Sequence, residues 1–308
     1  MNIPVCHTPA QIWAVASGKG GVGKSFIAAN LAMAFAAHEQ RTILIDLDLG
    51  SANAHTCLGI NQTQHTLSQL LNHRDMDINN LVERGHNPFI GLISGSDDDF
   101  DMANLKHFQK LKIMRNIKHL DADYIILDLG AGTGFNTLDF FLFADQGILA
   151  VVPEPTSIEN TYRFVKSLLA RKLKSLPHQS QTLIHGILNK QKKTMGKVQS
   201  FAALLNDMLE KHPKHGQIIQ TSLATLNLNL MVNQVIDPAD IKLGESMQVV
   251  FQRYFTLALN YLGYLHHDAH VVRALKQRES YFQLYPQSRN ATCLLRITEK
   301  IITKQHSS

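Results

Sequence analysis

The chain has 308 residues, of which 44% are hydrophobic, and it carries a formal net charge of +5. It is long enough to bury one sizeable core and lies near the upper limit for a single α/β domain. Three cysteines far apart in the sequence, Cys6, Cys57 and Cys293, exclude a disulfide framework and a paired-thiol metal site. Residues 1–11 lack a basic start with an apolar core, and polar residues interrupt the apolar stretch 138–153. We therefore expect a cytoplasmic protein with no signal peptide and no membrane span.

Short apolar runs alternate along the chain with longer segments of helical periodicity. Runs this continuous are typical of a parallel sheet covered on both faces, and their alternation with helices predicts a doubly wound α/β fold. The predicted strands are 12–16, 42–45, 124–127, 148–152 and 183–188. The predicted helices are 25–37, 103–118, 137–143, 158–173, 198–211 and 246–258. We expect the polar segment 61–87 and the acidic segment 97–101 to form loops at the rim of a single domain over 1–288.

The remaining segment, 289–308, is predicted to form a C-terminal amphipathic helix. At about 100° per residue, its apolar residues, among them Leu294, Ile297 and Ile301, share one face, while the charged residues share the other. Such a face either docks on the core of its own domain or contacts an anionic membrane surface. The sequence leaves both interpretations open.

A glycine-rich segment, Gly-Lys-Gly-Gly-Val-Gly-Lys-Ser over 18–25, follows the first predicted strand and opens the first predicted helix. It matches G-x-x-x-x-G-K-[ST] in the required context, in which glycines let successive backbone N–H groups face one anion at a helix N-terminus. Lys24 is then placed to neutralise the β- and γ-phosphates, and the Ser25 hydroxyl to coordinate Mg²⁺. The predicted nucleotide contacts here are Gly18, Lys19, Gly20, Gly21, Val22, Gly23, Lys24, Ser25 and Phe26.

Two later strands end in acidic residues. Asp46 and Asp48 point to the same side because strand side chains alternate, and they should lie beside the glycine-rich loop. Asp46 also suits a simpler role, which is to cap the next segment. Asp128 ends the strand 124–127 and is expected to hold Mg²⁺ directly or through water. The glycines at 130, 132 and 134 predict a segment whose backbone shifts in response to a γ-phosphate.

The motif K-G-G-x-G-K-S over 19–25 resembles the deviant Walker A motif of the MinD/ParA P-loop ATPases. The resemblance implies a slow, dimer-coupled ATPase in which Lys19 contacts the phosphates held by the other subunit and acts in catalysis beside Lys24. It also implies that Asp48, in the first switch of the family, orients the attacking water next to the metal. The implied cofactors are ATP and Mg²⁺, and the implied assembly is a homodimer formed with ATP.

Three further site residues follow from the resemblance alone. Asn53 lies just beyond the first switch. Glu154 belongs to a Pro-Glu-x-x-Ser segment that lies near the dimer interface in the family. Asn189 ends the predicted strand 183–188, where the family has an asparagine that reads adenine, although a lone asparagine there also suits a turn.

Within this family the chain is most similar to the flagellar-number regulators called FlhG or FleN. Four local matches support that branch: 46–50 with 52–55, 128–132, 260–264, and Tyr-Pro-Gln-Ser over 285–288. Membership would imply regulation of flagellar number or placement. The implied partners are a flagellar GTPase, a transcription regulator or flagellar switch proteins, with peripheral recruitment to the inner face of the cell membrane.

Three other functions remain open. A MinD-like cell-division or polar positioning factor would use the same nucleotide chemistry with another partner. A ParA-like partition ATPase would bind DNA phosphates through the basic residues over 166–197. A non-hydrolysing scaffold would keep ATP only as a structural ligand, and the presence of Asp48 argues against this last alternative.

Overall fold

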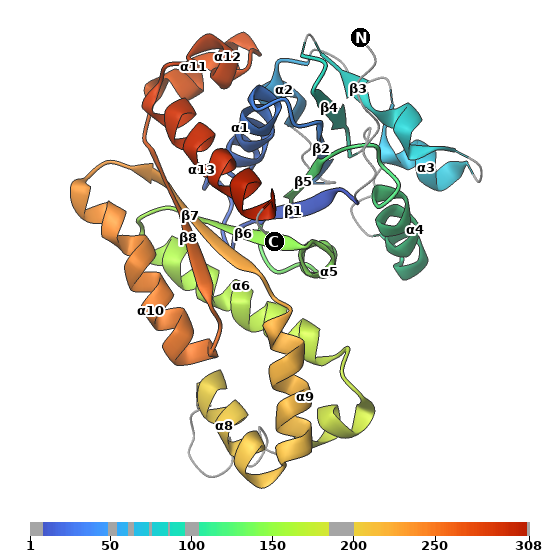
Figure 1. Ribbon diagram of the computed structural model, residues 1–308, viewed down its shortest axis with the longest axis vertical. Coiled ribbons are helices and arrows are strands. Elements are labelled where there is room, and N and C mark those ends of the chain that lie inside the picture. The colour runs from blue at the N-terminus through green and yellow to red at the C-terminus, as the bar shows by residue number, and fades with distance from the viewer. Residues whose placement is uncertain are drawn as a thin grey trace.

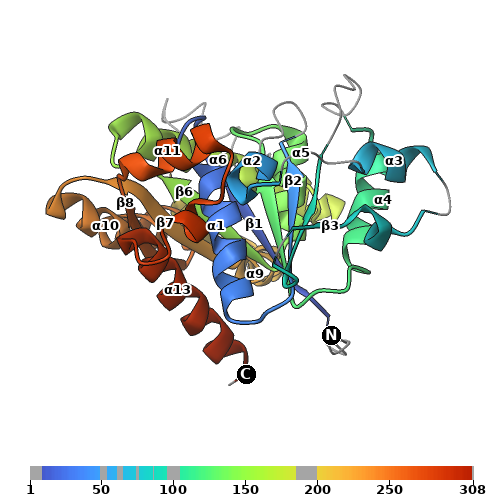
Figure 2. The ribbon, with the colours of Figure 1, turned by 90° about the horizontal axis from the view of Figure 1, so that it is seen from above.

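The computed structural model describes residues 9–48, 54–60, 65–73, 76–85, 87–95, 105–184 and 200–306. Its strands are β1 (Gln11–Ala16), β2 (Thr42–Leu47), β3 (Glu83–Arg84), β4 (Ile90–Ile93), β5 (Tyr124–Leu129), β6 (Gln146–Val151), β7 (Leu228–Val235) and β8 (Leu259–His266). They form one sheet in the order β3-β4-β2-β5-β1-β6-β7-β8, in which only β3 and β4 pair antiparallel. Helices cover both faces of this sheet (Figure 1 and Figure 2), so the predicted doubly wound α/β fold is confirmed.

Each face of the sheet has its own hydrophobic core. In β5, Ile125 and Leu127 belong to one core and Tyr124 and Ile126 to the other, because successive side chains point to opposite faces. The first core is covered by α3 (Leu67–Asn72), α4 (His107–Ile117), α5 (Phe135–Phe143), α6 (Pro155–Leu173), α8 (Phe201–Lys211), α9 (Pro213–Ala224) and α10 (Leu243–Phe255). The second is covered by α1 (Lys24–Ala37), α2 (Ala54–Leu58), α12 (Tyr281–Leu284) and α13 (Arg289–His306), beside α11 (Ala269–Gln277).

One predicted strand is wrong where the structure describes it. Leu183 and Ile184 lie at the end of a helical segment over 178–184, and residues 185–188 lie outside the described residues. Besides β1, the parallel neighbour of β6 is β7, a strand that was not predicted from the sequence. A short apolar run fits a buried strand and a buried helix equally well, so periodicity could not separate them. The segment 61–87 is likewise more than a loop, because it contains α3, the 3₁₀ turn Ile78–Leu81 and β3.

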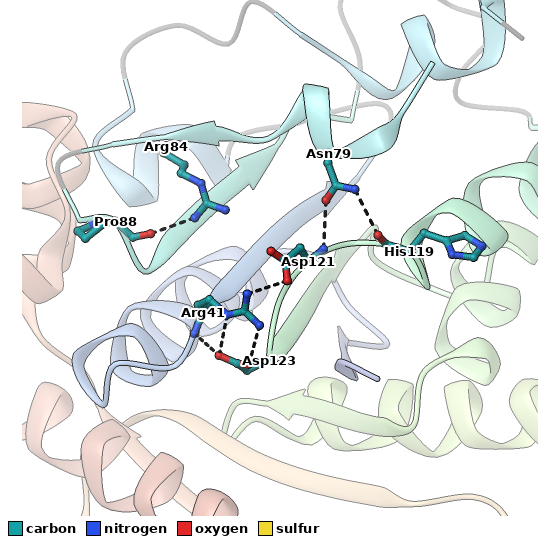
Figure 3. Close-up of polar contacts among 7 residues, drawn as sticks. All are labelled: Arg41, Asn79, Arg84, Pro88, His119, Asp121 and Asp123. Carbon is teal, nitrogen blue, oxygen red and sulfur yellow. Dashed lines mark hydrogen bonds and ion pairs between the residues drawn. The ribbon is translucent and has the colours of Figure 1, made fainter. Parts of the chain in front are cut away.

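Arg41 holds the beginnings of β2 and β5 together (Figure 3). Its guanidinium forms ion pairs with Asp121 at 2.6 Å and Asp123 at 3.1 Å, and its backbone N–H donates to the Asp123 carboxylate at 2.7 Å. Asn79 adds a second contact by accepting from the Asp121 N–H at 3.1 Å. With this end fixed, β2 and β5 stay in register along their lengths, and Asp46 comes to lie opposite Asp128.

The C-terminal helix α13 packs along α1 (Figure 1). Ala291, Leu294 and Ile297 are buried in the second core. Near its end, the Tyr124 hydroxyl donates to Gln305 Oε1 at 2.5 Å. The apolar face of the predicted amphipathic helix therefore covers the core of its own domain. In the described part of the chain, no helix combines the length and apolar character needed to cross a membrane.

Candidate nucleotide-binding site

The glycine-rich loop lies between β1 and α1, at the carboxyl edge of the sheet. Gly21 and Gly23 have φ of 80° and 86°, a left-handed conformation that favours glycine. A Cβ at Gly18 would lie 2.2 Å from the Asn160 carbonyl oxygen, whereas one at Gly20 or Gly21 would meet no described atom within 4 Å. The loop is thus packed on its inner side and open on its outer side, where the uncapped N-terminus of α1 offers its N–H groups to an anion.

The loop is held from the side by β7. The Asn233 amide donates to the Val22 carbonyl at 2.8 Å, and the Gln234 amide donates to the Gly21 carbonyl at 3.3 Å. Any side chain at Gly23 would collide with the Asn233 amide, since a Cβ there would lie 2.4 Å from its nitrogen. Asn233 was not among the site residues predicted from the sequence. The available signal was the largely apolar run 228–232 that precedes it, which is typical of a buried strand ending in polar residues.

Within the loop and the first turn of α1, Lys24 is buried and Ser25 is half-buried. The Phe26 ring packs edge-on against Tyr281 of α12, with ring centroids 5.2 Å apart. The side chain of Phe26 therefore belongs to the core, and only its backbone is available for the predicted nucleotide contact.

The predicted acidic residues meet beside this loop and have different surroundings. Asp46 accepts hydrogen bonds from the N–H groups of Asp48 at 3.1 Å and Ala54 at 2.9 Å, so it caps the start of α2. Asp128 is only 1% exposed, and neither of its carboxylate oxygens has a hydrogen-bond partner among the described residues. Burial, followed by the charge of Asp46, raises the pKa of Asp128, while Ser25 and Lys24 oppose this shift.

These surroundings fit a bound Mg²⁺. A buried carboxylate without donors is costly, and a divalent cation that prefers oxygen ligands would satisfy it. Ser25 and Asp128 would hold the ion directly or through water, with Asp48 close to them. The ion would supply positive charge beside the phosphate loop, where a nucleotide carries its negative charge.

Asp48 also contacts the second glycine-rich segment. A Cβ at Gly130 would lie 3.3 Å from the Asp48 carboxylate, and the Gly132 N–H donates to the Ser17 carbonyl at 2.9 Å. A displacement of this segment would therefore change the surroundings of Asp48 and the hydrogen bond to Ser17, where β1 leads into the phosphate loop.

Lys19 is held by its own chain. Its ammonium lies 2.7 Å from the Glu154 carboxylate and 3.4 Å from the Thr156 hydroxyl. Both charged side chains are well exposed, at 40% for Lys19 and 55% for Glu154. The structure thus brings these two predicted residues together. The other two residues predicted from resemblance, Asn53 and Asn189, lie outside the described residues.

A cavity of about 760 Å³ opens at the carboxyl ends of β7 and β8, next to the Gln234 contact with the loop. The His270 and Tyr285 rings lie against each other there, with centroids 4.5 Å apart. No motif in the sequence indicated this cavity. Its lining includes Ile236, His267, Asp268, Tyr285, Pro286 and Ser288.

Residues 13–281 match the family model of the CobQ/CobB/MinD/ParA nucleotide binding domain. The chain therefore belongs to this family, whose MinD/ParA members are P-loop ATPases. It is similar to the antiactivator FleN of Pseudomonas aeruginosa, with 26% identity over 294 residues that cover 95% of this chain and 86% of that protein. It is 30% identical to the flagellum site-determining protein YlxH of Helicobacter pylori over 156 residues, which cover 50% of this chain and 52% of that protein.

Solved structures agree with the fold. The septum site-determining protein MinD from Pyrococcus horikoshii, complexed with Mg-ADP, superposes with a TM-score of 0.63 at 18% identity, covering 95% of this chain and 96% of that one. At this identity the likeness shows the shared architecture alone.

Proposed function

We propose that the protein is an ATP-driven switch that binds Mg-ATP, dimerises around it and hydrolyses it slowly. The observation that carries this proposal is the convergence of the open phosphate loop, Asp48 and the unsatisfied Asp128 carboxylate at one edge of the sheet. Lys24 neutralises the phosphates, Ser25 and Asp128 hold the metal, and Asp48 orients the attacking water.

The adenosine half of ATP occupies the cavity at the ends of β7 and β8. Its lining begins at Val235, the residue after Gln234, and includes the tilted ring pair of His270 and Tyr285, and both features support this assignment. Asn233 suits the adenine-reading position better than Asn189, because Asn233 lies near the carboxyl end of the strand that pairs with β6. Its amide nitrogen is engaged by Val22, which leaves its carbonyl oxygen to face a ligand.

Lys19 is the residue that links hydrolysis to dimerisation. To contact a phosphate in the partner subunit, Lys19 must break its ion pair with Glu154. Both side chains are exposed, so breaking the pair costs little free energy. A cation supplied in trans stabilises charge on the transferred phosphoryl group. ATP is then hydrolysed only where two subunits meet.

In the cell, we propose that this switch regulates the number or placement of flagella. Similarity to FleN over most of both chains, together with similarity to YlxH, supports this role. The partners would be a flagellar GTPase, a transcription regulator or flagellar switch proteins. Partner capture with protein held in its ATP-bound form tests this role, and recovery of division components would instead indicate a division or polar positioning factor. Binding of ATP without turnover would instead indicate a scaffold.

The division of roles between the two loop lysines tests the proposal. Lys24→Ala should abolish ATP binding, because the buried ammonium beside the phosphates is lost. Lys19→Ala should bind ATP within about threefold of the wild type but fail to dimerise, since an exposed pair contributes little within one subunit. Isothermal titration with ATP and sedimentation in Mg-ATP measure the two properties. Equal loss of ATP binding in both variants would refute this assignment.

A further inference from the structure

Helices α4, α5 and α6 lie on the same face of the sheet (Figure 1), and their segments hold far more basic than acidic residues. The segments 105–118, 135–143 and 155–174 contain ten Lys or Arg residues and two Asp or Glu residues. The rest of the chain holds the other twenty Lys or Arg and twenty-three Asp or Glu residues, so outside this layer the net charge is negative. The layer therefore presents a local excess of cations that the modest overall charge conceals.

Large apolar side chains point outward from the same layer. Phe108 and Leu111 on α4 are 66% and 39% exposed, and Phe135 at the start of α5 is 66% exposed. On α4 these two lie opposite Ile113 and Ile117, which are buried against the sheet. We call Phe108, Leu111 and Phe135, together with Arg115 of the same face of α4 and the exposed Lys106 that precedes the helix, the α4–α5 surface.

Lateral contacts make α4 and α5 a continuous surface. Lys110 of α4 forms an ion pair with Asp139 of α5, and the Lys118 ammonium lies over the Phe143 ring at 5.5 Å. Contacts at two successive levels keep the helices side by side, so their outer faces point the same way. Phe135 lies one turn before Asp139 on the same side of α5.

The exposed cations of this surface lie apart from the acidic residues that the structure describes. In the part of the chain that the structure describes, no carboxylate lies within 4 Å of the charged groups of Lys106 or Arg115. Apolar side chains flanked by cations match an anionic bilayer surface, where rings and aliphatic chains enter the headgroup boundary and cations contact the headgroups. Nucleic acid fits less well, because Leu111 cannot stack on a base and the Arg171 guanidinium already lies over the Phe135 ring at 5.1 Å.

We propose that the α4–α5 surface is a docking site for a membrane rich in anionic lipid. This differs from a membrane role for α13, whose apolar residues Leu294 and Ile297 are buried against the domain and would have to undock first. The α4–α5 surface needs no such rearrangement. It also does not depend on ATP-driven dimerisation, although a dimer would present two copies and bind more tightly.

Vesicle co-sedimentation of the full chain tests the proposal. The probes are vesicles of phosphatidylcholine alone and of equal parts phosphatidylcholine and phosphatidylglycerol, each with and without Mg-ATP. The test variants are Phe108→Ser with Phe135→Ser, and Lys106→Glu with Arg115→Glu. The matched apolar control is Val249→Ser with Tyr254→Ser, which removes side chains that are 67% and 52% exposed on α10. The tail control is Arg296→Glu with Lys300→Glu, at exposed positions of α13.

Wild type, apolar control and tail control should bind the anionic vesicles alike, and both α4–α5 variants should bind at least about tenfold more weakly. Circular dichroism melting should match the wild type for all variants, because every substituted side chain is exposed. The proposal is overturned by unchanged binding of the phenylalanine variant, by loss of binding in the tail control, or by no binding of the wild type to anionic vesicles. Tighter capture of duplex DNA than of vesicles, lost only in the charge variant, would also overturn it and assign the surface to nucleic acid. The proposal predicts vesicle binding with and without Mg-ATP. A failure of the proposed ATP switch would therefore leave this result unchanged.

Discussion

At the scale of single residues, Asp46 and Asp128 show how two acids in register on neighbouring strands take different roles. Asp46 accepts one backbone N–H on each carboxylate oxygen, as a capping residue should. Asp128 lies across from it and is equally buried, but no backbone N–H among the described residues donates to its carboxylate. Burial and the charge of Asp46 make deprotonation of Asp128 costly, and a bound metal ion would offset that cost, so this residue couples metal binding to stability.

Asp128→Asn should therefore stabilise the nucleotide-free protein while weakening its response to Mg-ATP. Removing a buried carboxylate without donors should raise the free energy of unfolding by about 1–3 kcal/mol. The added stability that Mg-ATP provides should shrink, because a metal ligand is lost. Urea unfolding in EDTA and in Mg-ATP measures both. Asp46→Asn is the control and should lower the free energy of unfolding, since the single amide oxygen cannot accept both of the hydrogen bonds that the two carboxylate oxygens accept. A less stable nucleotide-free Asp128→Asn protein would contradict this interpretation of the site.

At the scale of elements, Asp139 joins three helices of one layer. Its carboxylate accepts from Lys110 of α4 and from Arg171 of α6, whose Nε lies 2.6 Å away. Burial tends to raise the pKa of Asp139, but the hydrogen bonds and charges of Arg171 and Lys110 outweigh it, so that the pKa lies below its usual value. Lys110 is itself buried and depends on this partner.

Asp139→Asn should destabilise the protein by about 3 kcal/mol at neutral pH, because it leaves the buried Lys110 without a counter-charge. A carboxyl with a lowered pKa contributes stability above its unfolded pKa of about 3.9 and loses it as the pH falls through the lower folded value. The difference in free energy of unfolding between wild type and variant should thus be largest at neutral pH and decrease as the pH falls into the acid range. Urea unfolding across this range measures it, with Glu159→Gln as an exposed-pair control expected to change stability by under about 0.5 kcal/mol. A difference that grows in acid would exclude this role for Asp139.

At the scale of the whole molecule, the parts that would respond to a γ-phosphate lie at one edge of the sheet. Asp48 touches Gly130, Gly132 is hydrogen-bonded to Ser17, and Lys19 lies on the exposed side with Glu154. α13 and the helices α8 and α9 are placed away from this edge (Figure 1 and Figure 2). An ATP dimer formed through the phosphate edge would leave α13 and both cores undisturbed.

Asp48→Ala should trap that dimer. Water activation would be lost while the phosphate contacts of the loop and Lys24 persist, so turnover should fall by about 10²–10⁴-fold with Mg-ATP still bound. Sedimentation velocity in Mg-ATP should show the variant accumulating as a dimer, and phosphate release gives its turnover. Asp207→Ala, remote from the phosphate edge, should behave as wild type. Turnover at the wild-type rate in Asp48→Ala would remove Asp48 from the chemistry.

The sequence by itself determined the fold class, the phosphate loop and the acids at the strand ends, because apolar periodicity and glycine spacing are local and follow from backbone geometry. It did not determine which strand follows β6: a six-residue run at 183–188 resembled a strand, whereas the next strand that the structure describes is β7, which begins only after α8 and α9. Asn233 on the loop, the Lys19–Glu154 pair and the burial of α13 against α1 were decided by tertiary structure. Each depends on segments more than one hundred residues apart, and no local pattern encodes which distant side chain fills a given space.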